Sequence, residues 1–245
     1  KYMILENNDI FTVSINGFEI NIKSNYHYNL HKVVGSQKVF SPDPYPHWTL
    51  KEIYEQVDAV KHATKLGSRL LSNDKIVLGG LQSNKEHLLN LDHMIILGCG
   101  TSYHSGIICM RMLKQLKLFT CVQIFDGAEF SIIDIPTTGK TGAILISQSG
   151  ETKDLHRCIQ ICRNHNIFTI GVVNVVDSLI AREVDCGCYL HAGREVGVAS
   201  TKAFTSQVLV LSLMTIWFAQ EKDKSIQERK PVSYTHLTLP TSPKV

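Results

Sequence analysis

The chain has 245 residues, 44% of them hydrophobic and 19% charged, which is enough apolar material to bury a sizeable core. The net charge of +3 is small and the lysines and arginines are scattered, so composition favours neither nucleic acid nor a membrane surface as a partner. We expect no secretory signal, and residues 208–219, the longest apolar run, are too few to span a bilayer and predict a core helix. Seven cysteines without an Asn-x-Ser/Thr sequence favour the reducing cytoplasm.

The first residues predict a β-hairpin. Residues 10–15 and 18–22 form strand-like runs on either side of Asn16-Gly17, a dipeptide that favours a tight hairpin turn. Two strands alone are only marginally stable in water. We therefore expect residues 1–30 to need partners beyond this segment.

A linker and a first helix follow the hairpin. Residues 31–48 are polar and contain three prolines in alternation, a composition typical of a linker. A helix then begins near Thr49. Its spacing predicts an apolar side made of Leu50, Ile53, Tyr54, Val57 and Val60.

From Leu91 onward strand patterns and helix patterns alternate, which indicates βαβ units and a parallel sheet. The predicted strands are residues 93–99, 119–125, 142–147, 168–173 and 188–191. The predicted helices are residues 105–116, 151–165, 178–182 and 202 to about 220. Five parallel strands with helices on both faces predict a doubly wound, flavodoxin-like α/β domain, which we place at residues 49–230.

Three loops rich in small residues and hydroxyls follow predicted strands, at residues 99–102, 147–152 and 198–201. Ligands of doubly wound sheets bind at the carboxyl ends of the strands. One such loop alone is more often a capped turn without a ligand, but three at one edge predict a phosphate site, because backbone can approach closely and hydroxyls can donate. In the second loop we predict that Ser149 caps the following helix and that Glu151 favours its first turn.

Other motifs leave alternatives open. Gly98-x-Gly100 after a strand is typical of dinucleotide-binding folds, although Tyr103 stands at the third glycine position. A nucleotide-dependent oxidoreductase is therefore an alternative. Cys186 and Cys188 fit buried thiols better than a metal site, and we expect no metal.

Two basic residues beside the loops also have two interpretations. His104 could contact a substrate, but a solvated or helix-capping histidine is equally compatible with its position. Lys202 could neutralise a phosphate, although an exposed lysine in the first turn of a helix is the more common arrangement.

Taken together, the loops resemble a known family. Residues 99–104, 147–152 and 195–207 are similar to the three signature loops of the first sugar-isomerase (SIS) subdomain of glutamine:fructose-6-phosphate amidotransferase, the glucosamine-6-phosphate synthase family. Residues 51–56 and 77–81 add to the match, which covers roughly residues 48–220.

The resemblance implies a site and a reaction. The positions that would hold a sugar phosphate are Ser102, Ser147, Gln148, Ser149 and Thr152. The positions that would lie along the sugar are Thr101, Val198 and Ser200. The implied enzyme converts fructose 6-phosphate and glutamine to glucosamine 6-phosphate and glutamate. We expect no cofactor, and we expect the full-length protein to form a homodimer or a larger assembly.

The resemblance also concerns parts of the family beyond these loops. The hairpin of residues 1–30 resembles only the tail of the family's glutaminase domain, and residues 231–245 fit neither the family nor a helix, so we expect a non-native tail there. The family's isomerisation residues lie in its second SIS subdomain. We therefore assign no catalytic residue and expect this chain to bind a sugar phosphate without turnover. A regulatory SIS module that senses a sugar phosphate is the alternative.

Overall fold

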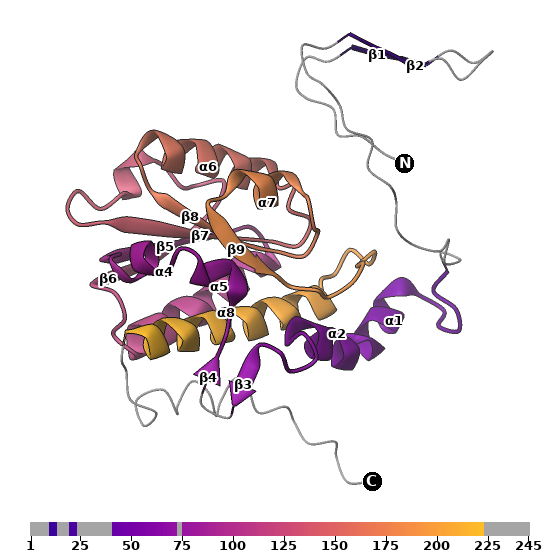
Figure 1. Ribbon diagram of the computed structural model, residues 1–245. Coiled ribbons are helices and arrows are strands. Elements are labelled where there is room, and N and C mark those ends of the chain that lie inside the picture. The colour runs from indigo at the N-terminus through magenta and orange to yellow at the C-terminus, as the bar shows by residue number, and fades with distance from the viewer. Residues whose placement is uncertain (1–9, 14–19, 24–40, 73–74, 223–245) are drawn as a thin grey trace. The chain divides into compact units, whose positions relative to one another are not determined.

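The computed structural model describes residues 10–13, 20–23, 41–72 and 75–222 (Figure 1). The chain divides into two units, and the boundary lies between Ser41 and Pro42. In the first unit, β1 (Ile10–Val13) pairs antiparallel with β2 (Ile20–Lys23), which confirms the predicted strand pairing with shorter strands. The Asn16-Gly17 turn lies outside the described residues, as do residues 231–245. The assignments of residues 1–30, 31–48 and 231–245 stay predictions.

The second unit is built on the predicted parallel sheet. Its strands are β5 (His93–Gly98), β6 (Cys121–Asp126), β7 (Thr141–Ser147), β8 (Phe168–Val173) and β9 (Cys186–Tyr189). They lie in the order β6-β5-β7-β8-β9, and each neighbouring pair is parallel. The flavodoxin-like fold class is thus confirmed. The strand order reverses between β5 and β7, the place where such sheets bind ligands.

Helices cover both faces of the sheet (Figure 1). One face packs against α6 (Lys153–Asn164) and α7 (Leu179–Glu183), and the other against α5 (Thr101–Gln115) and α8 (Lys202–Glu221). Strand residues alternate between the two cores, with Ile95 and Leu97 on the α6 side and Ile96 on the α8 side. The smaller elements are α1 (Trp48–Tyr54), α2 (Gln56–Ala63), β3 (Leu70–Ser72), β4 (Lys75–Ile76), α3 (Gly79–Gln82), α4 (Lys85–Leu89) and the 3-10 helix η1 (Ile132–Asp134).

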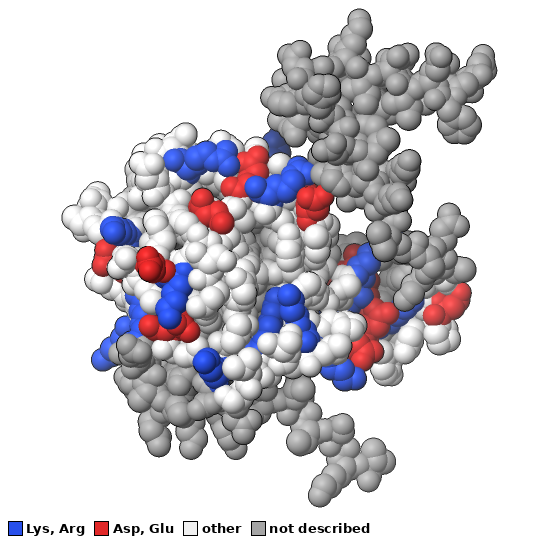
Figure 2. Space-filling view, viewed as in Figure 1, with Lys and Arg blue, Asp and Glu red and all other residues white. Residues whose placement is uncertain are grey.

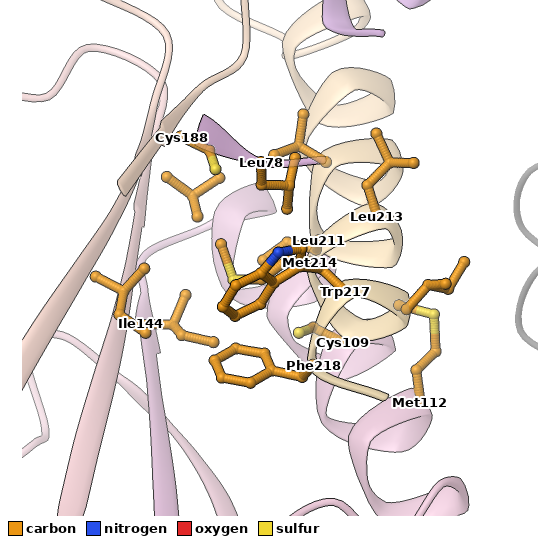
Figure 3. Packing of buried hydrophobic residues seen from close by; sticks show 14 of the residues in the cluster. Leu78, Cys109, Met112, Ile144, Cys188, Leu211, Leu213, Met214, Trp217 and Phe218 are labelled. Atoms are coloured by element: carbon orange, nitrogen blue, oxygen red, sulfur yellow. The ribbon is translucent and has the colours of Figure 1, made fainter. Parts of the chain in front are cut away.

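The apolar helix α8 lies in the core, as predicted. It is long and apolar enough to cross a membrane, but 78% of its most apolar window is buried within this fold. Figure 3 shows Trp217 and Phe218 of α8 packed among residues of the sheet and of α5. The hydroxyls of Ser212 and Thr215 donate to the carbonyls of Val208 and Leu211, so they add no unpaired polar group to the core. On the face seen in Figure 2, basic and acidic side chains are interspersed.

Several element ends differ from the prediction. Helix α5 begins four residues early, at Thr101, because Gly100 adopts φ +57 and acts as its N-cap. Strand β9 ends at Tyr189 instead of residue 191, since His191 takes φ +55, a conformation that breaks a strand.

The main correction to the sequence prediction concerns the first helix. It is two helices, α1 and α2, joined at Glu55, and the predicted apolar side is wrong apart from Val60. Leu50, Ile53, Tyr54 and Val57 are exposed, Tyr54 and Val57 by 64% and 65%. Glu52 is buried instead, with 1% of its surface exposed, and its carboxylate accepts backbone hydrogen bonds from the loop before α8. Those bonds offset the burial of a charged side chain and turn the polar side inward.

Helix α3 packs closely against the sheet at one of its two adjacent glycines. A Cβ at Gly80 would lie 1.9 Å from the carbonyl oxygen of Gly187 in β9, whereas a Cβ at Gly79 would meet nothing within 4 Å. We expect Gly80→Ala to lower the free energy of unfolding by more than about 2 kcal/mol, because backbone must move to admit the methyl group. Gly79→Ala is the matched control and should change it by less than about 1 kcal/mol. Urea unfolding of both variants measures the difference, and equal stabilities would contradict this packing.

Candidate functional site

One cavity brings the three loops together at the carboxyl edge of the sheet. Its volume is about 420 Å³, and residues from the loops after β5, after β7 and before α8 line it. The wall includes all eight residues chosen from the sequence: Thr101, Ser102, Ser147, Gln148, Ser149, Thr152, Val198 and Ser200. The structure therefore gathers the predicted residues. Their role in binding stays a prediction.

The loop after β5 places a hydroxyl at the cavity. Gly98 is required there, because a Cβ would lie 2.9 Å from the backbone of Ser102. Ser102 is buried in the first turn of α5, and Gln207 Nε2 from α8 donates to its Oγ at 2.9 Å. Gln207 is itself held by Ser105, whose Oγ lies 3.2 Å from Gln207 Oε1. Because Ser102 Oγ accepts this bond, its own hydrogen remains available to a ligand.

The loop after β7 is braced by Ser147. Its Oγ accepts from the backbone N–H of Gly150 at 3.0 Å and lies 2.9 Å from Thr152 Oγ1. Gly150 has φ +70, and a Cβ there would lie 1.9 Å from Ser178 Oγ, so glycine is needed for both conformation and space. When Ser147 donates to Thr152, the Thr152 hydroxyl can donate into the cavity.

Two predictions for this loop are wrong. The N-cap of α6 is Thr152, and Ser149 instead accepts from the backbone N–H of Glu151 at 3.1 Å in a local turn. Glu151 does not interact with the first turn of α6 as predicted either. Its Oε1 accepts from the N–H of Leu179 at 2.9 Å and so caps the first turn of α7.

The loop before α8 is organised by Glu195. Its carboxylate accepts from the backbone N–H groups of Thr201 at 2.9 Å and Ala203 at 3.1 Å, and from Ser200 Oγ at 3.1 Å. This carboxylate therefore caps α8 and opposes the positive end of its dipole. Lys202 fits neither of its two interpretations: it is buried, and its Nζ lies 2.6 Å from Glu55 Oε2.

The charges around the cavity are unevenly distributed. Of the described residues that line it, Glu195 alone carries a formal charge. Within residues 75–222, no side chain caps the first turn of α5 or α6. In α5 the N–H groups of Ser102 and Tyr103 donate to the carbonyls of Cys99 and Gly100, so what both helices offer an anion is the positive end of a helix dipole. An anion is therefore favoured at the α5 and α6 side, and an uncharged group at the α8 side.

Sequence reasoning missed three further features of the wall. Glu195 could have been found from its position shortly before a helix, where an acid is favourable. Gly197 lets the loop pass close to α1, and Cys99 lies beside Ser102. Burial, with Asp126 and Asp154 nearby, raises the pKa of Cys99, so its thiol stays protonated at neutral pH. His104 is exposed and does not line this cavity.

A larger cavity of about 930 Å³ borders the first across Gln148, Ser149 and Glu195. Its wall includes His62 and His191. Burial lowers the pKa of His191, and neighbouring Arg69, Lys65 and His62 lower it further, so its imidazole is neutral at pH 7. Lys65 and Arg194 also line it, so charge alone would favour an anion there too, whereas the smaller cavity has the N-termini of α5 and α6 and the hydroxyls of the three loops.

A doubly wound sheet with three hydroxyl-bearing loops around one cavity at its carboxyl edge defines a ligand-binding α/β domain, and comparison with known proteins gives its family. The chain belongs to the SIS domain family, whose pattern matches residues 87–217, just over half of its length.

Its relatives include named enzymes. The probable glutamine–fructose-6-phosphate aminotransferase (isomerizing) of Acanthamoeba polyphaga mimivirus is 41% identical over 92% of this chain and 36% of that protein. The Bacteroides thetaiotaomicron aminotransferase is 38% identical over 73% of this chain and 29% of that protein. The C-terminal domain of the Francisella tularensis enzyme matches in structure with a TM-score of 0.70 and 33% identity, over 79% of this chain and 54% of that one. The resemblance inferred from the loops is thus confirmed. The chain spans about a third of the length of the first two relatives.

The bracing role of Ser147 can be tested by stability. Ser147→Ala leaves the buried N–H of Gly150 without an acceptor, so we expect a loss of about 1–3 kcal/mol in the free energy of unfolding. Ser149→Ala removes only a partly exposed turn contact and should cost less than about 0.5 kcal/mol. Urea unfolding in phosphate-free buffer compares the two, and a larger loss for Ser149→Ala would contradict the assignment.

Proposed function

We propose that this chain binds the phosphate ester of a hexose, fructose 6-phosphate or glucosamine 6-phosphate. It does so as the sugar-phosphate-binding part of an enzyme that converts fructose 6-phosphate and glutamine to glucosamine 6-phosphate and glutamate. The observation that carries the proposal is the cavity in which two uncapped helix N-termini meet a set of hydroxyls, while the third N-terminus is already neutralised by Glu195. The names of the relatives support the reaction.

The phosphate end would lie at α5 and α6. Ser102 and Ser149 each have an oxygen that accepts a protein hydrogen bond, so each hydroxyl hydrogen is free to donate to the phosphate. Thr152 can donate through its contact with Ser147, and Gln148 supplies an amide. These donors are neutral, and the helix dipoles supply the favourable potential for the dianion.

The sugar end would lie against the loop before α8. Thr101, Val198 and Ser200 line that part of the cavity, and Glu195 makes it unfavourable for a second anion. A sugar hydroxyl is a compatible neighbour because it can donate to a carboxylate or a serine oxygen. The two ends of the cavity thus match the two ends of a sugar phosphate.

We expect this chain to bind without turnover. The charged group among the described wall residues, Glu195, already accepts the hydrogen bonds that cap α8, so it is poorly placed to move a proton on the sugar. We further propose that the acid and base of the isomerisation belong to another part of the enzyme, that the whole protein forms a homodimer or larger assembly, and that it works in the cytoplasm.

Binding at this position can be tested with two hydroxyl deletions. Ser149→Ala and Thr152→Ala should each weaken fructose 6-phosphate binding by about 1–2 kcal/mol, roughly 5–30-fold in Kd, because each removes one donor to the phosphate. Isothermal titration calorimetry measures the affinity. Thr138→Ala is the control, since Thr138 is exposed in the loop that leads into the opposite end of β7. Unchanged affinity in both variants would show that the anion binds elsewhere.

A further inference from the structure

A buried carboxylate outside the cavity holds one of its walls. Glu52 of α1 is 1% exposed, and its Oε1 accepts from the backbone N–H of Val196 at 2.5 Å and of Gly197 at 3.1 Å. Its Oε2 lies 3.2 Å from the Gly197 nitrogen and completes a bifurcated contact. Both oxygens thus face the loop backbone, 144 residues away in sequence.

The loop lies directly against α1 at this point. A Cβ at Gly197 would lie 2.7 Å from Glu52 Oε2 and 2.8 Å from Thr49 Oγ1, so only glycine fits. Further along, Glu55 pairs with Lys202 and Thr205 Oγ1 donates to Gln56 Oε1, each at 2.6 Å. Polar residues of α1 and of the start of α2 therefore hold the loop and the first turn of α8 in place.

The segment held in this way forms the sugar side of the cavity. Glu52 fixes residues 196 and 197, and Glu195 fixes residues 201 and 203. Val198 and Ser200 lie between these two anchors and line the cavity. The phosphate side is built by the loops after β5 and β7, which Glu52 does not contact through any hydrogen bond seen in residues 41–72 and 75–222.

We infer that Glu52 is a positioning residue that sets the distinction between a sugar phosphate and a bare phosphate. This inference rests on the proposed function and deepens it. Glu52 keeps Val198 and Ser200 at the distance that a sugar needs, and it leaves the donors to the phosphate unchanged. An alanine at this position would leave both backbone N–H groups without their acceptor, whereas a glutamine could keep both through its one oxygen, because Oε1 accepts from Val196 and from Gly197.

The test compares two ligands on the 245-residue chain. We expect Glu52→Ala to weaken fructose 6-phosphate binding by about tenfold or more, because a displaced wall misplaces the sugar, and to change the affinity for inorganic phosphate by less than about twofold. Calorimetry gives the first affinity, and competition by inorganic phosphate gives the second. Gly197→Ala moves the same loop while keeping Glu52, so it should show the same selective loss.

The control is Glu221→Ala at the far end of α8, where the carboxylate pairs with Lys85. It should change neither affinity. Equal weakening of both ligands in Glu52→Ala and Gly197→Ala would show a purely structural role, and unchanged affinities would show no role; either result overturns the inference alone. A wild-type chain that binds neither ligand overturns the proposed function as well.

Discussion

The contact between the Glu195 carboxylate and the first turn of α8 decides how the cavity can be used. Three helices begin at the loops that line the cavity, and each would otherwise present a positive dipole end there. Because Glu195 accepts from Thr201 and Ala203, one of the three is neutralised by the protein itself. The remaining two N-termini, of α5 and α6, converge at the strand switch between β5 and β7. The cavity therefore has a side that favours an anion and a side that does not, and the proposed sugar phosphate would fit it in one orientation.

The hydroxyls at the anion side are prepared by buried partners. Gln207 reaches from α8 to fix the oxygen of Ser102, and Ser147 fixes both the turn at Gly150 and the hydroxyl of Thr152. Each partner is buried, so its own rotamer is restricted by packing. Donors that are already oriented lose little entropy when a ligand arrives. In the proposed complex, neutral donors would hold the phosphate without the desolvation of lysine or arginine that direct ion pairing requires.

The sheet and the meeting of the three loops around one cavity could be predicted from the sequence, because buried parallel strands are short apolar runs and their carboxyl ends share one edge. The strand of residues 142–147 and the serine-rich loop after it needed no tertiary information. The capping pattern around Ser149 and Glu151 could not be predicted in the same way. Glu151 is adjacent to α6 in sequence, yet it caps α7, which a chain crossover brings to its side. Capping rules based on sequence assign an acidic residue to the helix that follows it. In the folded protein Glu151 instead lies next to the N-terminus of α7.

The prediction of the apolar side of the first helix was wrong for a related reason. A hydrophobic pattern assumes that the inner side of a helix meets other side chains, but the inner side of α1 meets the backbone of the loop before α8, at Val196 and Gly197. Backbone N–H groups that are removed from water need acceptors, so a carboxylate is the stabilising residue there, and Leu50 and Ile53 are left at the surface. The helix that precedes the sheet thus supports the wall of the cavity from outside, and its buried polar residue is explained by the loop that it holds.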